Sequence, residues 1–90
     1  MLKVGLLGAG RIGHVHATNI AGHAQSQLVA VSDVNVASAE KLAAAYGAKA
    51  ATTGEILNDP AIDAVLIATS TDTHSDLIEA ATAAGKAVLC

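Results

Sequence analysis

Short apolar runs alternate with longer amphipathic stretches along the whole chain. The runs are rich in Val, Leu and Ile, which is typical of strands buried on both faces of a sheet. The stretches between them repeat apolar residues at helical spacing, which predicts helices. The pattern predicts strands at 4–7, 27–33, 48–51, 63–69 and 86–90, and helices at 11–23, 35–47, 52–58 and 73–84.

Residue types that begin and end helices support these bounds. Asn35 is a suitable N-cap for the second helix, and Gly47 is suited to its C-terminal end. Thr52 and Glu55 have the spacing of a capping box, which begins a brief helix. Asp72 or Thr73 is expected to cap the start of the last helix, and Gly85 is expected to end it.

The helical spacing also predicts the apolar faces of the helices. In the first helix, Ile12, Val15 and Ile20 recur at this spacing. The residues expected to face the core from the second helix and the last are Val36, Ala39, Leu42, Ala43, Tyr46, Leu77, Ile78 and Ala81.

Alternation of strands and helices predicts an α/β fold with a parallel sheet of about five strands. Right-handed crossovers between parallel strands place helices on both faces, which makes the sheet doubly wound. The chain ends within its last predicted strand, so we expect it to be a fragment of a longer protein.

Composition and charge narrow the functional classes. The formal net charge is −3 and 14% of the residues are charged, without a Lys/Arg cluster, so nucleic acid is not an expected partner. Cys90 is the single cysteine, which leaves no disulfide framework and no cysteine pair for a metal. No apolar run suits a membrane span and the N-terminus does not resemble a signal peptide, so we expect a cytoplasmic protein.

Gly8, Gly10 and Gly13 form the pattern G-x-G-x-x-G where the first predicted strand meets the first predicted helix. In a strand–helix–strand unit, this pattern indicates a loop that binds the diphosphate of a dinucleotide. Gly8 would allow a tight turn, Gly10 the approach of the diphosphate, and Gly13 close packing of the helix. The N–H groups around Arg11 and Ile12 would bind the phosphates at the positive end of the helix. The alternative is a glycine-rich turn without a ligand.

Asp33 closes the second predicted strand, where its carboxylate could accept hydrogen bonds from both hydroxyls of an adenosine ribose. A 2′-phosphate there would meet like charge, and the following Val34 and Asn35 supply no cation to neutralise it. NAD is therefore favoured over NADP as the cofactor. Alternatively, Asp33 could be a solvated carboxylate at a strand end or could cap a helix.

The fourth predicted strand leads into Thr69, Ser70 and Thr71, at the edge where open parallel sheets bind ligands. Their hydroxyls could contact the cofactor, cap the next helix, or do both. His74 follows at the start of that helix and is the one histidine expected on the ligand side, with a surface position as the alternative.

The remaining histidines and two residues near the end of the chain are assigned no chemistry. His14 and His23 are expected in solvent and His16 beside the sheet, and their spacings do not converge on a metal site. Lys86 is expected to be a solvated charge, and Cys90 a buried strand residue.

With these residues placed, the chain resembles the N-terminal part of the glucose–fructose oxidoreductase/inositol dehydrogenase family over essentially its whole length. The segment "VGLLGAGRIGHVHA" is similar to the opening of inositol 2-dehydrogenase-type members, and "VAVSD", "DAVLIATSTDTHSDLIEAA" and "AGKAVLC" match later blocks in order. The resemblance implies a Rossmann-like fold in which residues 1–90 form an N-terminal fragment of the dinucleotide-binding domain. It also implies NAD-dependent hydride transfer to or from a polyol or sugar hydroxyl.

The resemblance assigns roles to the matching positions. The residues implied for the diphosphate are Gly8, Gly10, Arg11, Ile12 and Gly13, and Asp33 is implied for the adenine ribose. The residues implied for the path to the nicotinamide are Ala68, Thr69, Ser70 and His74. Ser70 stands where many members have proline, which puts the shape of that loop in doubt.

The resemblance also places the family's catalytic groups outside these residues. A Glu-Lys-Pro motif with a catalytic lysine would follow Cys90, and an Asp/His pair would lie in a separate substrate-binding domain. We therefore expect cofactor binding with little or no dehydrogenase turnover. A further strand would normally pair beyond 86–90, which leaves an exposed edge at Ala87, Val88 and Leu89. We therefore expect two chains to form a homodimer, either edge to edge or by swapping elements.

Three other classes compete with this interpretation. A non-catalytic nucleotide- or coenzyme A-binding module could share the glycine loop, but it does not need Asp33. A methyltransferase-type fold would use a different glycine arrangement, with an acid nearer the first strand. A purely structural, self-associating module stays open from the sequence alone.

Overall fold

The computed structural model describes residues 2–68 and 74–89. Within these ranges the elements follow one another in the predicted order, and each overlaps its predicted range. They are β1 (Leu2–Leu7), α1 (Arg11–Gly22), β2 (Ser26–Ser32), α2 (Val36–Ala45), β3 (Lys49–Ala50), α3 (Thr53–Asn58), β4 (Ala64–Ile67), α4 (His74–Ala83) and β5 (Ala87–Leu89).

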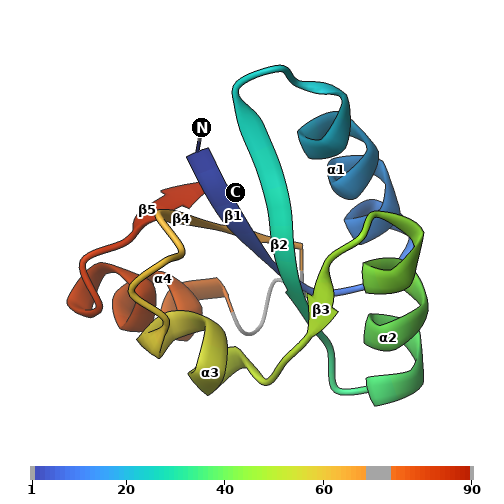
Figure 1. Cartoon of the computed structure of the whole chain (residues 1–90). Coiled ribbons are helices and arrows are strands. Elements are labelled where there is room, and N and C mark those ends of the chain that lie inside the picture. Colours follow the sequence, from blue (N-terminus) through green and yellow to red (C-terminus); the bar gives the residue numbers. More distant parts are fainter. Residues whose placement is uncertain (1, 69–73, 90) are drawn as a thin grey trace.

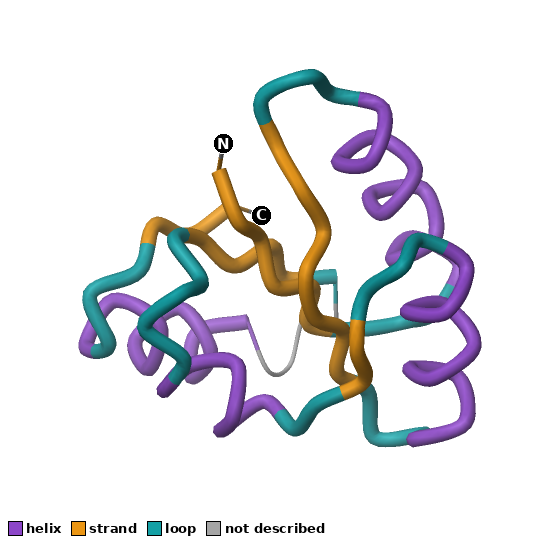
Figure 2. Tube along the Cα trace, viewed as in Figure 1, coloured by secondary structure: helices purple, strands orange, loops and turns teal. Residues whose placement is uncertain are grey.

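The five strands form one parallel sheet in the order β3-β2-β1-β4-β5 (Figure 1). Helices α1 and α2 cover one face, and α3 and α4 cover the other (Figure 2). The predicted doubly wound sheet is therefore confirmed. The sheet grows from β1 toward β3 and then, after a crossover, from β1 toward β5. Ligands of such sheets bind outside the carboxyl ends of the strands at this switch point.

Each face of the sheet has its own apolar core, because successive residues of a strand point to opposite sides. In β1, Leu6 belongs to the core under α1 and α2, and Leu7 to the core under α3 and α4. Gly5 faces α3, and a Cβ on it would lie 2.5 Å from Cγ2 of Ile56. A glycine in this central strand thus lets α3 approach the sheet.

Several apolar residues at helical spacing are exposed. Ile12 and Val36 are each 62% exposed, and Val15 and Ile78 are also in contact with solvent. The prediction that Val36 and Ile78 face the core is wrong. Val36 lies in the first turn of α2, beside a cavity instead of a strand, and α4 buries Ala81 fully while Ile78 lies at the margin of the contact. Helical spacing identifies apolar positions but does not say how far the neighbouring layer extends.

Lys86 is buried, with 8% of its surface exposed, so the prediction of a solvated charge is wrong. Its Nζ donates hydrogen bonds to the carbonyl oxygens of Asp59 (2.6 Å) and Ile62 (2.8 Å). Both carbonyls lie in the connection between α3 and β4, far from Lys86 in the sequence. The ammonium is satisfied inside the protein by backbone oxygens that only the fold brings to it.

No helix in the described ranges combines the length and the apolar character needed to cross a membrane.

Candidate functional site

The glycine-rich loop joins β1 to α1 at the carboxyl ends of the strands, which for β1 and β2 are the lower ends in Figure 1. Gly8 has φ of +113°, which side-chain-bearing residues rarely adopt, and its N–H donates to the Ser32 carbonyl at 2.7 Å. A Cβ on Gly13 would collide with the carbonyl oxygen of Gly8. The backbone of the loop therefore requires glycine at both positions, independently of any ligand.

Gly10 differs because the space beside it is open. A Cβ there would meet no atom within 4 Å, and its φ of −78° and ψ of −165° suit any residue. Gly10 is the N-cap of α1, and among the described residues no side chain caps this helix. The first turn also has no acidic residue. The N–H groups of Arg11, Ile12 and Gly13 thus keep their hydrogen-bonding capacity at the positive end of the helix, as a phosphate site requires.

The carboxylate of Asp33 lies against the glycine loop. Its Oδ2 accepts a hydrogen bond from the N–H of Ala9 at 2.9 Å, and its Oδ1 accepts one from the N–H of Asn35 at 3.3 Å. The residue is half-buried. Each carboxylate oxygen can accept more than one hydrogen bond, so the group can still bind hydroxyl donors. The fold thus brings the end of β2 and the mouth of α1 together, with the acid oriented before any ligand arrives.

The other residues predicted for the site follow β4, which pairs directly with β1. Ala68 is half-buried, and its N–H donates to the carbonyl of Leu7 at 2.8 Å, beside the start of the glycine loop. His74 is the first residue of α4, as predicted. The predicted residues that lie outside the described ranges are Thr69, Ser70, Thr71, Asp72, Thr73 and Cys90.

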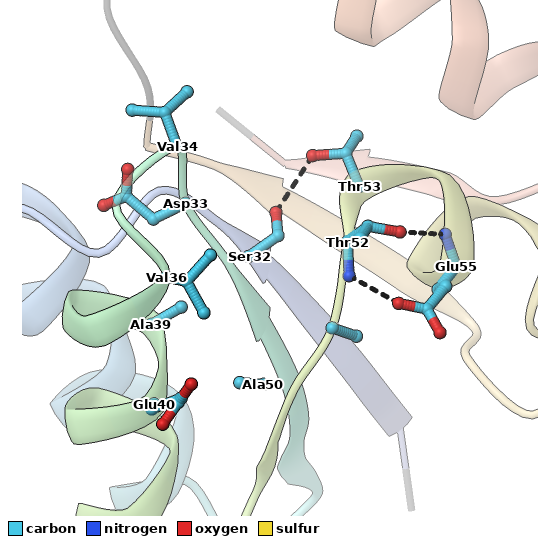
Figure 3. Close-up of a pocket in the computed structure, with 11 residues that line it drawn as sticks. Ser32, Asp33, Val34, Val36, Ala39, Glu40, Ala50, Thr52, Thr53 and Glu55 are labelled. Carbon is cyan, nitrogen blue, oxygen red and sulfur yellow. Dashed lines mark hydrogen bonds between the residues drawn. The ribbon is translucent and has the colours of Figure 1, made fainter.

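A cavity of about 370 Å³ adjoins Asp33 between α2 and the segment from β3 to α3 (Figure 3). Glu40 from α2 and Glu55 from α3 stand on opposite walls, and Ala50 of β3 lies between them. Sequence reasoning did not include Glu40 or Glu55 in the site. Acidic residues on amphipathic helices carry no local signal that distinguishes a cavity wall from a solvated face.

Glu55 is held in place by the predicted capping box, which is confirmed. The Thr52 Oγ1 accepts from the Glu55 N–H at 3.1 Å, and the Glu55 Oε1 accepts from the Thr52 N–H at 2.9 Å (Figure 3). The hydrogen bond that the Thr52 N–H donates to the Glu55 carboxylate is the largest cause that lowers the pKa of Glu55 below its usual range. The carboxylate is therefore negatively charged at neutral pH.

The histidines of the first helix region do not form a site. His14 and His23 are exposed, as predicted, and His16 is half-buried. In the described part of the chain, no three His, Cys, Asp or Glu side chains gather as metal ligands.

A dinucleotide needs donors for its diphosphate next to an acceptor for its ribose. The mouth of α1 and Asp33 offer these side by side, at the switch point of an open parallel sheet. This geometry is that of a dinucleotide-binding domain of the Rossmann class. The chain belongs to the GFO/IDH/MocA family, described as an oxidoreductase family with an NAD-binding Rossmann fold, whose model matches residues 2–90.

Inositol dehydrogenases are among the relatives that match. The inositol 2-dehydrogenase of Rhizobium meliloti (strain 1021) is 53% identical over 89 residues, which are 99% of this chain and 27% of that protein. The crystal structure of a myo-inositol dehydrogenase from Corynebacterium glutamicum ATCC 13032 matches with a TM-score of 0.94 and 43% identity, over 100% of this chain and 27% of that chain.

A third match was solved with ligands. The scyllo-inositol dehydrogenase of Lactobacillus casei, with bound NAD(H) and scyllo-inositol, matches with a TM-score of 0.88 and 34% identity over 98% of this chain and 27% of that chain. This chain spans about 27% of the length of each of the three relatives. The matches confirm the predicted family, the Rossmann-like fold and NAD as the cofactor class.

Proposed function

We propose that residues 1–90 are the NAD(H)-binding part of an inositol 2-dehydrogenase-like oxidoreductase and form the N-terminal part of its dinucleotide-binding domain. The observation that carries this proposal is the Asp33 carboxylate bonded beside the open N-terminus of α1. Donors for a diphosphate and an acceptor for a ribose lying side by side support this proposal.

The chain's own residues bind and orient the cofactor in this proposal. The N–H groups of Arg11, Ile12 and Gly13 hold the diphosphate, which approaches over Gly10, and Asp33 accepts the ribose hydroxyls. The residues proposed to line the path to the nicotinamide are Ala68, Thr69, Ser70 and His74. When bound, the nicotinamide supplies hydride transfer to or from a carbon that carries a hydroxyl group.

The substrate of the whole enzyme is proposed to be a polyol of the inositol type, and the location cytoplasmic. The resemblance places the catalytic lysine and the Asp/His pair outside the matching residues. We therefore propose that the 90 residues bind the cofactor with little or no turnover of their own.

The proposed site is tested by titrating the unsubstituted chain and the Asp33→Ala variant with NADH and with NADPH. The chain is expected to bind NADH more tightly than NADPH, and the substitution to weaken NADH binding about 10- to 100-fold for each ribose hydrogen bond that is lost. The reason is the loss of hydrogen bonds to a charged acceptor, each contributing about 1.5–3 kcal/mol. Binding constants from amide chemical-shift changes measure this effect.

Asp63→Ala is the matched control. Its Oδ2 also accepts a hydrogen bond from a backbone N–H, that of Lys3, at 2.9 Å. Asp63, however, directly precedes β4, so it lies at the amino ends of the strands, opposite the proposed site. NADH affinity should not change in this variant. Equal binding of both cofactors, together with no effect of Asp33→Ala, would show that the ribose assignment is wrong.

We also propose that two of these 90-residue chains pair through β5, supported by the position of this strand at one edge of the sheet that the described residues form. Edge strands carry backbone groups that can extend a sheet into a second molecule. Light scattering at increasing concentration is expected to show a dimer, and monomers alone at high concentration would contradict the proposal.

A further inference from the structure

Two hydroxyl groups join the end of β2 to the start of α3. Ser32 is the last residue of β2 and is 3% exposed, and Thr53 is the first residue of α3. Their side-chain oxygens lie 3.0 Å apart, so one hydroxyl donates a hydrogen bond to the other (Figure 3). We propose that Ser32 and Thr53 are positioning residues for the cofactor, because this bond fixes the strand end that holds the glycine loop. The inference rests on the proposed function.

The backbone of Ser32 connects this hydroxyl pair to the glycine loop. The Ser32 carbonyl oxygen accepts a hydrogen bond from the Gly8 N–H at 2.7 Å. Gly8 is the residue at which the chain leaves β1, with φ of +113°, and α1 begins shortly after it. A displacement of the Ser32 carbonyl would therefore change this turn and move the N–H groups that are proposed to hold the diphosphate.

The carboxylate proposed for the ribose depends on the same strand end, since Asp33 directly follows Ser32. Its Oδ2 accepts a hydrogen bond from the N–H of Ala9 at 2.9 Å. Ser32 and Asp33 therefore hold consecutive N–H groups of the loop, one with a carbonyl oxygen and the other with a carboxylate oxygen. The hydroxyl pair thus supports the donors and the acceptor of the proposed site together.

A hydrogen bond fixes a position more narrowly than an apolar contact does. Hydrophobic burial has no preferred direction, whereas a hydrogen bond has a preferred length and angle. The other buried residues of β2 are apolar, and Ser32 is the buried polar residue of this strand. A directional bond therefore occurs at the residue whose carbonyl and whose neighbour hold the loop.

The test removes the bond from each side in turn. Ser32→Ala lacks one hydroxyl, and Thr53→Val lacks the other while it keeps a similar side-chain shape. Each variant is expected to bind NADH about threefold to tenfold more weakly, measured by NMR titration under conditions in which each variant is folded. Thr53→Ser keeps the hydroxyl and should bind NADH within about twofold of the unsubstituted chain.

The double variant, Ser32→Ala with Thr53→Val, separates positioning from a purely structural role. In each single variant the remaining hydroxyl loses its partner, which lowers stability, whereas replacing both partners with apolar side chains is close to neutral. Urea denaturation of the double variant should therefore give a midpoint closer to that of the unsubstituted chain than either single variant gives. NADH affinity should stay as low as in the single variants, because the directional bond is still absent.

Ser26→Ala is the matched control at the other end of β2. The Ser26 hydroxyl also bonds to a helix, donating to the Ile20 carbonyl of α1 at 2.8 Å, but Ser26 is the first residue of the strand and lies away from the proposed site. NADH affinity should stay within about twofold of that of the unsubstituted chain. The amide signals of Gly8 and Ala9 in the free chain should shift in Ser32→Ala and not in Ser26→Ala.

Unchanged NADH affinity in Ser32→Ala or in Thr53→Val would overturn the inference. Recovery of affinity together with stability in the double variant, or an equal loss of affinity in Ser26→Ala, would do the same. Such a result with normal NADH binding by the unsubstituted chain overturns the inference alone. Failure of the unsubstituted chain to bind NADH overturns the proposed function and the inference with it.

Discussion

Gly10→Ala is expected to weaken NADH binding by at least about tenfold while the fold stays intact. The methyl group would enter the open space beside the loop, where no protein atom lies within 4 Å. A diphosphate that approaches the N–H groups of α1 through this space would be displaced. The loss of one hydrogen bond between an N–H and a charged phosphate is worth about 1.5–3 kcal/mol, or roughly 10- to 100-fold in affinity.

The protein itself should tolerate this methyl group. The backbone of Gly10 has φ of −78° and ψ of −165°, so alanine needs no rearrangement. Alanine is a poorer N-cap than glycine by up to about 1 kcal/mol, and the lower entropy of the unfolded chain offsets about 0.4–1 kcal/mol of this. Urea denaturation should therefore give a midpoint close to that of the unsubstituted chain.

Gly13→Ala is the contrasting variant, because its Cβ would collide with the Gly8 carbonyl oxygen and destabilise the folded chain. NMR titration with NADH and urea denaturation of both variants separate the two effects. Wild-type NADH affinity in Gly10→Ala would show that the diphosphate does not approach here.

Lys86→Met is expected to lower the free energy of unfolding by about 1–3 kcal/mol. The Lys86 ammonium donates to the carbonyl oxygens of Asp59 and Ile62, and the side chain is 8% exposed. Methionine replaces most of the lysine stem but donates no hydrogen bond, so the Ile62 carbonyl would lose this donor and the Asp59 carbonyl would keep only the N–H of Ile62 at 3.1 Å. The connection between α3 and β4 would lose its link to the start of β5. Urea denaturation followed by circular dichroism measures the change.

Lys49→Met provides a control, because Lys49, like Lys86, contacts Asp59. The Lys49 Nζ lies 3.7 Å from Oδ2 of Asp59, but the Lys49 side chain is 67% exposed. Exposed ion pairs contribute about 0–1 kcal/mol, so this variant should unfold within about 0.5 kcal/mol of the unsubstituted chain. Equal effects of the two substitutions would show that burial of Lys86 adds nothing.

The elements and the binding loop could be predicted because their signals are local. Apolar runs and helical spacing marked all the described strands and helices, and Asn35, Thr52 and Glu55 were correctly expected to cap. The glycine pattern could be located from spacing alone, since the strand–loop–helix geometry involves neighbouring residues. The sequence segments shared with the family then supported NAD as the cofactor class, which the comparisons confirmed.

The errors concern residues whose environment is created by distant segments. Lys86 has no sequence signal for burial, because its partners are carbonyl oxygens, which every residue possesses. Val36 and Ile78 have the correct spacing for a core position but lie where the neighbouring layer does not cover them. The cavity between Glu40 and Glu55 likewise depends on how α2 and α3 flank the sheet.

By itself, the sequence determined the succession of strands and helices, the glycine loop at the first junction and the acid at the end of the second strand. These depend on contacts within a few residues, so backbone preference and apolar spacing specify them. Only the tertiary structure decided that β1 lies between β2 and β4, that Asp33 bonds to the loop at Ala9, and that two glutamates face one cavity. Those features arise when segments far apart in the chain pack together, and no local pattern encodes which surfaces will meet.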